Sequence, residues 1–159
     1  IAGSMVQLED NLLPSANSKM AENLFKLNHF FGIPEFKLRA KKMTSLIQPV
    51  SFEEPLKHAN WLQSIYNFTF PFYEIAITGP LAIDKMNLLL PFYIPNSVIS
   101  TSASKSDLYL LKDRHDPIDS YYYVCENNFC KIPVQSIDEL FSLIDSKAED
   151  LIYNPNFFK

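Results

Sequence analysis

The hydrophobic pattern of this chain changes its period near residue 69, and this change limits the possible folds more than any other feature. Before it, apolar side chains recur every three or four residues, as on one face of a helix. After it come aromatic and β-branched runs that end in turn residues, as strands do. The pattern predicts an α+β fold in two parts. These are a helical segment over 1–68 and a small mixed α/β sheet unit with a β-hairpin and a C-terminal arm over 69–159.

The first part is predicted to hold three helices, over 15–31, 34–47 and 52–66. Gly32 follows the first of them, where a glycine commonly ends a helix, and Pro34 suits the first turn of the second. Ser51 and Glu54 form an S-x-x-E pattern, which predicts a capping box at the start of the third helix. Because two residues separate the first two helices, we expect an antiparallel helical hairpin.

The second part begins with a predicted parallel unit. A strand over 70–79, a helix over 81–92 and a strand over 96–101 follow one another in the order of a β-α-β unit. Residues 102–119 are predicted to be mostly loop. A short apolar island over 108–111 within that loop is either a helical turn or an edge strand.

The end of the chain predicts a hairpin and one more helix. Residues 120–134 form two apolar runs around Asn127 and Asn128, which tolerate the backbone conformation of a type I′ turn. Ser136 and Glu139 repeat the S-x-x-E pattern, so a last helix is expected from there to about residue 147. The remaining residues, 148–159, are expected to form an extended arm.

Charge and composition exclude several classes of function. The formal net charge is −4, and the densest basic run, 37–42, lies in a predicted helix, so no nucleic-acid partner is expected. No apolar run reaches the ~20 residues of a membrane span, so no membrane partner is expected. The 3 glycines form no Gly-rich phosphate loop, and His29, His58 and His115 are scattered, so the sequence predicts no cofactor and no metal site. Two cysteines close together are not a secreted disulfide framework, which favours a cytoplasmic location.

The first candidate site is a polar stretch at the start of the first predicted helix. A helix start leaves backbone N–H groups unpaired and carries partial positive charge. Carboxylate, hydroxyl and amide groups at such a place can hold a sugar or polyol, and two carboxylates can act as an acid and a base. The alternative is an ordinary helix cap that follows an acidic turn. The candidate ligand-binding residues are Glu9, Asp10, Ser15, Asn17 and Ser18.

The second candidate site is the pair Cys125 and Cys130. In a hairpin with a two-residue turn, the two cysteines lie directly opposite each other as a non-hydrogen-bonded pair, with Cα atoms about 4.5 Å apart. That spacing is at the short end of the range for disulfides. Two reduced structural thiols, a cross-strand disulfide, and a redox or metal site all remain open alternatives.

Two motifs in this chain resemble those of a known family. The stretch 10–18, DNLLPSANS, precedes a leucine-containing helix, and the stretch 123–134, YVCENNFCKIPV, follows it much later in the chain. Both resemble late segments of a family of large thioredoxin-domain proteins that includes the spermatogenesis-associated thioredoxin-like protein and its bacterial relatives. Residues 74–79 and 93–96 resemble segments between them, so the likeness covers roughly residues 8 to 145. Ala16 stands where that family usually has glycine.

This resemblance implies a context for the chain. Members of the family carry an N-terminal thioredoxin-like domain and then a helical region that resembles the (α/α)6 toroid of N-acylglucosamine epimerases and six-hairpin glycosidases. By this likeness, the chain is the last part of such a toroid followed by a small α/β appendage, and the polar stretch faces the central cleft. Residues 1–4 are expected to be a cloning remnant or the start of an excised domain, which also makes the chain a fragment.

Three classes of function are compatible with these features. The first is a fragment of a thioredoxin-fused, epimerase-like toroid that is inactive alone and binds a sugar-like molecule when intact. The second is a redox accessory that uses Cys125 and Cys130 with a thioredoxin domain. The third is a non-catalytic structural or interaction module. The expected partners are the rest of the parent chain, a sugar-like small molecule and, for the fragment, a second copy of itself.

Overall fold

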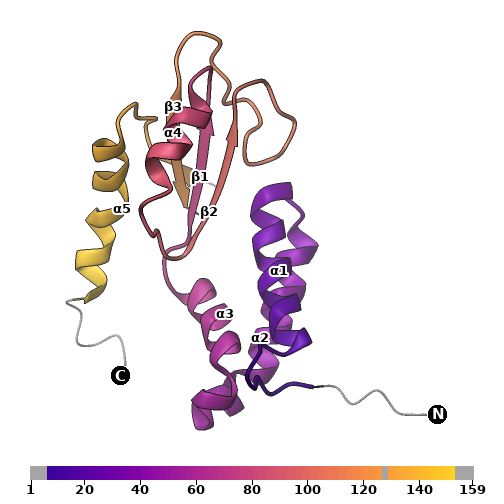
Figure 1. Cartoon of the computed structure of the whole chain (residues 1–159). Helices are drawn as coiled ribbons and strands as arrows, with labels where there is room; N and C mark the ends of the chain where they lie inside the picture. The colour runs from indigo at the N-terminus through magenta and orange to yellow at the C-terminus, as the bar shows by residue number, and fades with distance from the viewer. Residues whose placement is uncertain (1–6, 127–128, 153–159) are drawn as a thin grey trace. The chain divides into compact units, whose positions relative to one another are not determined.

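The computed structural model describes residues 7–126 and 129–152, and within helix α5 it describes side chains as far as Ile144 (Figure 1). The fold is α+β, as predicted, with a mixed four-stranded sheet. The chain divides into two compact units between Phe70 and Pro71, two residues after the boundary expected from the sequence. Each unit is described by itself below.

The first unit is helical. Its elements are α1 (Ala16–Phe31), α2 (Pro34–Glu53), the 3₁₀ turn η1 (Pro55–Lys57) and α3 (Ala59–Thr69). The α1 helix has Ser15 as its N-cap, whose side chain accepts a hydrogen bond from the backbone N–H of Ser18 at 3.1 Å. Gly32 ends α1 in the left-handed conformation, with φ of 65°, as the sequence predicts.

The predicted boundary between the second and third helices is wrong. The α2 helix continues through Pro49 to Glu53, and Ser51 lies inside it, where its hydroxyl donates to the carbonyl of Ile47 at 2.9 Å. Ser51 and Glu54 therefore form no capping box. The third helix, α3, begins only at Ala59 and is capped from outside its own sequence neighbourhood.

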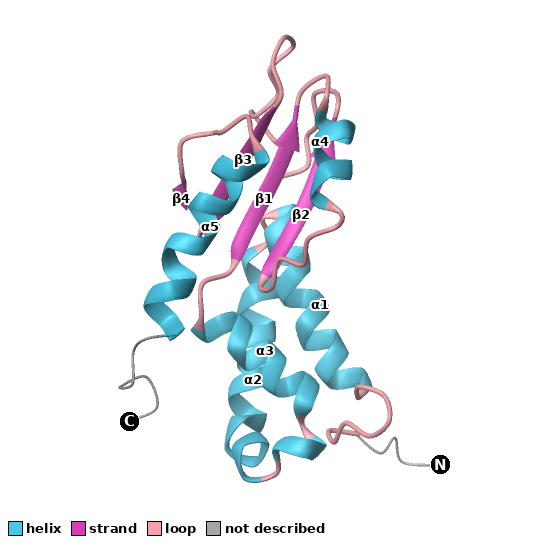
Figure 2. Ribbon diagram, turned by 60° about the vertical axis from the view of Figure 1, so that its left-hand side comes forward, coloured by secondary structure: helices cyan, strands magenta, loops and turns pink. Residues whose placement is uncertain are grey.

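The second unit is built on one sheet with the strand order β2-β1-β3-β4 (Figure 2). The strands are β1 (Tyr73–Thr78), β2 (Ser97–Ser102), β3 (Tyr121–Glu126) and β4 (Phe129–Cys130). The β1 and β2 strands are parallel and are joined by α4 (Ala82–Leu89), so the predicted β-α-β unit is confirmed. The β3 strand is antiparallel to both β1 and β4, and the predicted hairpin is confirmed.

The two faces of the sheet have different coverings. Tyr73, Ile75 and Ile77 alternate onto the face covered by α4 and α5 (Ile137–Ile152) (Figure 2). The core on this face also contains Ala82, Leu89, Tyr122, Val124, Leu140 and Ile144. The opposite face carries Glu74, Ala76 and Thr78 of β1 and, by register, Tyr121, Tyr123 and Cys125 of β3.

The last helix begins as predicted and ends later than predicted. The backbone N–H of Glu139 donates to the Ser136 hydroxyl at 3.2 Å, and the N–H of Ser136 donates to the Glu139 carboxylate at 3.0 Å. These reciprocal bonds form the expected capping box. The helix reaches Ile152, so the extended arm expected from residue 148 is wrong for 148–152. Residues 153–159 lie outside the described residues.

The segment 103–120 between β2 and β3 is a loop, as predicted. Its apolar island forms a helical turn, in which the backbone N–H groups of Leu111 and Lys112 both donate to the carbonyl of Leu108 at 2.8 Å. Leu110 and Leu111 are buried. The island therefore anchors the loop through these two side chains.

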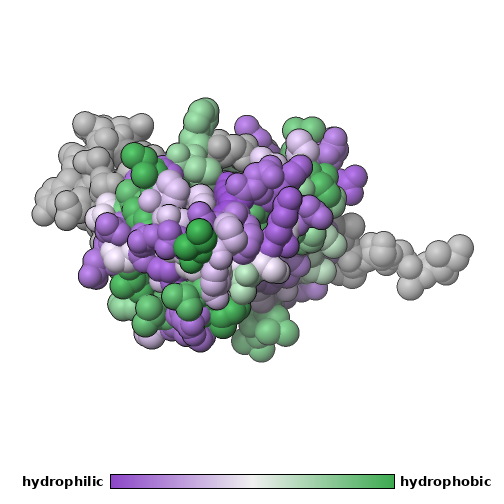
Figure 3. All heavy atoms as spheres, turned by 90° about the horizontal axis from the view of Figure 1, so that it is seen from above, coloured by the Kyte–Doolittle hydropathy of each residue, from purple (hydrophilic) through white to green (hydrophobic). Residues whose placement is uncertain are grey.

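The surface of the described residues mixes polar and apolar side chains. Figure 3 shows one face of the molecule, on which hydrophilic and hydrophobic residues are interspersed. Among the described residues, no helix has both the length and the apolar character needed to cross a membrane.

Candidate functional site

The cysteine pair joins β3 to β4, the strand at one edge of the sheet. Cys125 of β3 faces Cys130 of β4 in the register, as the two-residue turn predicts. Their Cα atoms are 3.9 Å apart, closer than the spacing expected from the sequence, and the two sulfur atoms form a disulfide. Of the alternatives left open by the sequence, the structure therefore has the cross-strand disulfide.

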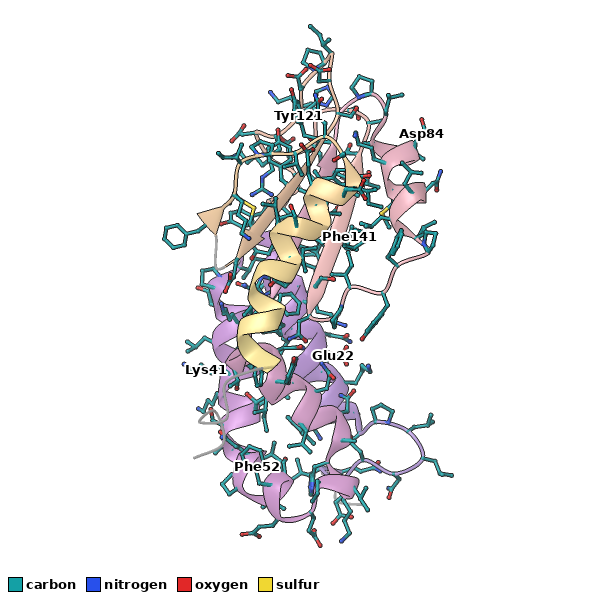
Figure 4. All side chains as sticks on the ribbon, turned by 90° about the vertical axis from the view of Figure 1, so that its left-hand side faces the viewer. Glu22, Lys41, Phe52, Asp84, Tyr121 and Phe141 are labelled. Carbon is teal, nitrogen blue, oxygen red and sulfur yellow. A yellow bond between two sulfur atoms is a disulfide. The ribbon has the colours of Figure 1, made fainter. Side chains whose placement is uncertain are left out.

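The two cysteines differ in their access to solvent. Cys125 is 1% exposed, whereas Cys130 is exposed on the outermost strand. Figure 4 shows the sulfur–sulfur bond beside this strand. An open hollow of about 390 Å³ lies at the hairpin and is lined by Tyr73, Val124, Cys125, Glu126, Phe129, Cys130 and Lys131. A thiol from solution can therefore approach the sulfur of Cys130 more readily than that of Cys125.

The Arg114 guanidinium lies against this disulfide. Its Nη2 atom is 3.4 Å from Sγ of Cys125 and 3.2 Å from Sγ of Cys130. Its Nη1 atom donates to the carbonyl of Leu110, and the guanidinium carbon lies 5.8 Å from the centre of the Tyr123 ring. A neutral disulfide is a weak acceptor, but a thiolate is an anion that a guanidinium stabilises strongly. Arg114 is therefore placed to favour the thiolate once the disulfide opens.

A buried carboxylate lies near the same guanidinium. Glu74 is 4% exposed, and it is the β1 residue directly opposite Cys125 on the same face of the sheet. Burial lowers the pKa of Arg114, and the opposing effects of Glu74, Tyr123 and Tyr109 only partly offset this decrease. Because a guanidinium stays protonated throughout the physiological pH range, the site combines one fixed cation, one buried carboxylate and one disulfide.

The backbone around Arg114 is held against the sheet by two hydroxyls. The carbonyl of Arg114 accepts hydrogen bonds from Thr78 Oγ1 at 2.5 Å and from the Tyr123 hydroxyl at 3.0 Å. Burial raises the pKa of Tyr123, so its hydroxyl keeps its proton as a donor near neutral pH. The position of the guanidinium thus depends on strands β1 and β3 as well as on its own loop.

Gly79 allows the same loop to close against the end of β1. Its φ is 113°, and a Cβ atom at this position would lie 2.2 Å from the carbonyl oxygen of Asp119. Only glycine combines that backbone conformation with so close an approach. The loop end that follows Arg114 is therefore fixed at a second point.

The polar stretch predicted as the first candidate site is centred on Asp10. Asp10 is 6% exposed. Its Oδ1 atom accepts one hydrogen bond from the backbone N–H of Ser15 and one from the hydroxyl of Ser18, both at 2.7 Å. Its Oδ2 atom accepts from the backbone N–H of Asn60 at 2.9 Å. Burial raises the pKa of Asp10, but these bonds and one from the Trp61 backbone outweigh it and leave the pKa below its usual value. One carboxylate thus caps the start of α3 and also holds Ser15, the N-cap of α1, and Ser18 in its first turn.

The other residues of that stretch take supporting positions. Ser15 and Ser18 are buried beside Asp10, and Asn17 donates from Nδ2 to the carbonyl of Gln7 at 3.0 Å. Glu9 is exposed, 3.8 Å from Lys57 Nζ. The structure therefore brings the five predicted residues together, and three of them are buried in contacts that join two helices. This arrangement is the capping alternative that the sequence also allowed.

Two residues of the disulfide site were not predicted from the sequence. Arg114 lies in a segment read as loop, and nothing local links it to the cysteines. Glu74 did give a signal, because it is the single charged residue in the apolar run 70–79. A lone carboxylate in a buried strand needs a partner, and that rule alone could have marked it.

Comparisons of this chain with family models, with curated proteins and with solved structures find no match. The resemblance to the thioredoxin-domain family therefore stays a prediction, and the function is argued from the site itself.

Proposed function

We propose that the second unit is a thiol–disulfide redox module that uses Cys125 and Cys130. One observation carries this proposal: the Arg114 guanidinium contacts both sulfur atoms of a disulfide whose Cys130 half is exposed. A purely structural disulfide does not need a cation beside it, since it carries no charge. A disulfide that opens does, because one of its sulfurs then leaves as an anion.

The exchange proceeds in two balanced steps. A thiolate of the electron donor attacks Sγ of Cys130 and forms a mixed disulfide, while the Cys125–Cys130 bond breaks. Sγ of Cys125 takes the electron pair and becomes a thiolate beside Arg114. A second thiolate of the donor then attacks the donor's own sulfur in the mixed disulfide and releases Cys130. The donor dithiol has been oxidised by two electrons, and the cysteine pair has been reduced.

The proposed cellular setting agrees with this chemistry. We place the protein in the cytoplasm, where lasting disulfides are rare and those that form are mostly transient, catalytic or redox-sensing. The proposed electron donor is a dithiol domain of the thioredoxin type, which the resemblance expects on the same parent chain. The cysteine pair would then serve as an accessory to that domain.

The sugar-binding hypothesis stays a prediction with less support. Both carboxylate oxygens of Asp10 already accept hydrogen bonds from helix starts, and Ser15 and Ser18 are buried. Within the described residues, the exposed members of the stretch are Glu9 and, in part, Asn17. A ligand at this place would have to compete with the contacts that join α1 to α3.

The test is a redox titration of the full chain with thiol counting. The wild type is expected to exchange between disulfide and dithiol in glutathione buffers of cytoplasmic composition. The variant Arg114→Met should be reduced roughly tenfold more slowly at neutral pH, because the leaving thiolate loses its cation. Arg39→Met is the matched control, since Arg39 is an exposed arginine of the first unit and should change nothing. A disulfide that resists reduction throughout, or equal rates for Arg114→Met and wild type, would refute the proposal.

A further inference from the structure

The backbone of Cys130 points to the open edge of the sheet. The N–H of Lys131 donates to the carbonyl of Val124 at 2.9 Å, so these two residues form a hydrogen-bonded pair of the hairpin. Hydrogen-bonded and non-hydrogen-bonded pairs alternate along antiparallel strands, so the neighbouring pair of Cys125 and Cys130 is a non-hydrogen-bonded one. The N–H and C=O of Cys130 therefore point away from β3. Because β4 is the last strand of the sheet, they point to the side where another strand would lie (Figure 2).

The disulfide lies across the strands and not along them. It joins directly opposite residues of β3 and β4, and Cys130 belongs to the strand at the open edge. A thiolate that attacks one sulfur of a disulfide displaces the other sulfur. A thiolate that arrives from the open edge therefore reaches Cys130 first and displaces Cys125. Figure 4 shows the disulfide beside the outermost strand.

From this juxtaposition we infer that the site also takes electrons from an extended, cysteine-bearing polypeptide segment, which adds to the edge of β4 as an antiparallel strand. This inference rests on the redox function proposed above and names a second class of donor for that site, besides the thioredoxin-type domain. The donor cysteine would form a hydrogen-bonded pair with Cys130, with Cα atoms about 5.5 Å apart and both side chains on the same face. Addition of a strand to a sheet edge is a known mode of peptide recognition.

The charge at the site suits this donor. The Arg114 guanidinium lies 3.2 Å from Sγ of Cys130 and attracts an incoming thiolate. In the step that follows, the donor sulfur bonds to Sγ of Cys130, and Sγ of Cys125 leaves with the electron pair toward the same guanidinium. Phe129, which lines the hollow at the hairpin and is 82% exposed, is also available for contact with the added donor strand.

The edge is short, which fits a transient encounter. Two residues lie between Tyr122 and Cys125, but three lie between Cys130 and Val134, the bridge partner of Tyr122. This extra residue is a β-bulge, and Pro133 within it has no N–H to offer. A bulge and a proline prevent long edge pairing, so a donor strand could pair closely only around Cys130. Redox partners commonly meet through such small interfaces.

The experiment compares four thiols as reductants of the full-length chain at equal thiolate concentration. The first is a five-residue, Val- and Thr-rich peptide with a central cysteine and blocked ends. The second carries an N-methyl group on that cysteine, which removes the N–H that would donate to the Cys130 carbonyl. The third carries the N-methyl group on the next residue, whose N–H points away from β4. The fourth is glutathione, which cannot add a strand.

The first and third peptides should reduce the disulfide about tenfold faster than the second peptide and glutathione, because the latter two cannot form the backbone hydrogen bonds to Cys130. In the variant Cys125→Ser, the mixed disulfide of Cys130 with the first peptide should slow hydrogen exchange of the Cys130 amide. The glutathione mixed disulfide should not. Equal rates for all four thiols would overturn the strand-addition inference and leave the redox function intact. If no thiol reduces the disulfide, both fail.

Discussion

Asp10 in the first unit and Arg114 in the second are both charged groups that connect segments far apart in the sequence. Asp10 accepts hydrogen bonds from Ser15 and Ser18 at the start of α1 and from Asn60, fifty residues away. Arg114 reaches from a loop to two sulfur atoms and is held in turn by Thr78. The partners of Asp10 are mostly backbone N–H groups, which cannot change their chemistry. The partners of Arg114 are the two halves of a bond that can break.

This difference separates a structural charge from a reactive one. The carboxylate of Asp10 is fully used by fixed donors, so its contribution is the same at all times and appears as stability. The contribution of Arg114 depends on the oxidation state of Cys125 and Cys130, because a thiolate attracts a cation far more strongly than a disulfide does. Removing Asp10 should therefore change unfolding, and removing Arg114 should change thiol chemistry.

The largest effect is expected for Asp10→Ala. The start of α3 loses its cap, worth about 1–2 kcal/mol, and the buried Ser15 and Ser18 lose a charged partner worth a similar amount. The free energy of unfolding should therefore fall by about 3 kcal/mol. Urea unfolding followed by circular dichroism measures this. Glu9→Ala, at the exposed neighbour, should leave stability unchanged, and the rate of disulfide reduction should be unaffected in both variants. A redox effect of Asp10→Ala without loss of stability would reverse the comparison.

Opening the disulfide should have the next largest effect. The bond closes a loop with a sequence separation of 5, and chain entropy predicts a loss of about 2 kcal/mol on reduction. Unfolding with and without a reductant measures the difference. In Arg114→Met the loss should be larger, because the reduced state no longer gains a cation–thiolate contact. The double variant Cys125→Ala/Cys130→Ala should not respond to the reductant, and a response there would point to another cause.

A smaller effect is expected for Thr78→Val, which removes the hydroxyl that donates to the Arg114 carbonyl. The free energy of unfolding should fall by about 1 kcal/mol, and reduction of the disulfide should slow as Arg114 loses its position. Thr101→Val is the matched control, because Thr101 donates in the same way to the carbonyl of Ala82. It should lose similar stability with no change in reduction rate. If both variants slow reduction equally, Thr78 has no special link to Arg114.

The smallest effect is the contribution of Asp10 to the pH dependence of stability, because burial opposes the hydrogen bonds that lower its pKa. Its pKa in the folded chain lies below the ordinary value of 3.8. The stabilisation is therefore complete above that value and is lost as the pH falls through the folded pKa. In Asp10→Asn, the free energy of unfolding should therefore fall less steeply with decreasing pH, measured from about pH 6 downward (the acid limb of the stability curve). An acid limb with the slope of the wild type would contradict this role of Asp10.

A control for this acid limb is Glu22→Gln. Burial raises the pKa of Glu22, but ion pairs with Lys19 and Lys26, each at 2.6 Å, outweigh it and leave the pKa lowered. Glu22 therefore contributes in the same direction over an adjacent pH range. Added salt is expected to weaken the contribution of Glu22 to the pH dependence of stability more than that of Asp10, because the ion pairs of Glu22 lie partly in solvent.

The parts of the fold that the sequence predicted are those whose contacts lie within a few residues. Ser136 and Glu139 cap each other across three residues, and Gly32 ends the helix that directly precedes it. The pairing of Cys125 with Cys130 follows from a two-residue turn. In each case, the local backbone geometry brings the partners together without help from the rest of the chain.

The same local pattern failed where the tertiary structure supplied a stronger alternative. Ser51 and Glu54 have the spacing of a capping box, but α2 continues past them, and Asp10 caps α3 from far away in the sequence. The disulfide itself was one of several possibilities in the sequence.

The amino-acid sequence by itself determined the two-part α+β division, the strand pairing at the hairpin and the clustering of polar groups before α1. Only the tertiary structure decided that Asp10 joins two helices and that Arg114 lies on the disulfide. The physical reason is the range of the contacts. A periodic pattern or a short turn places neighbours in the chain, whereas a buried charge finds its partners only when distant segments have packed around it.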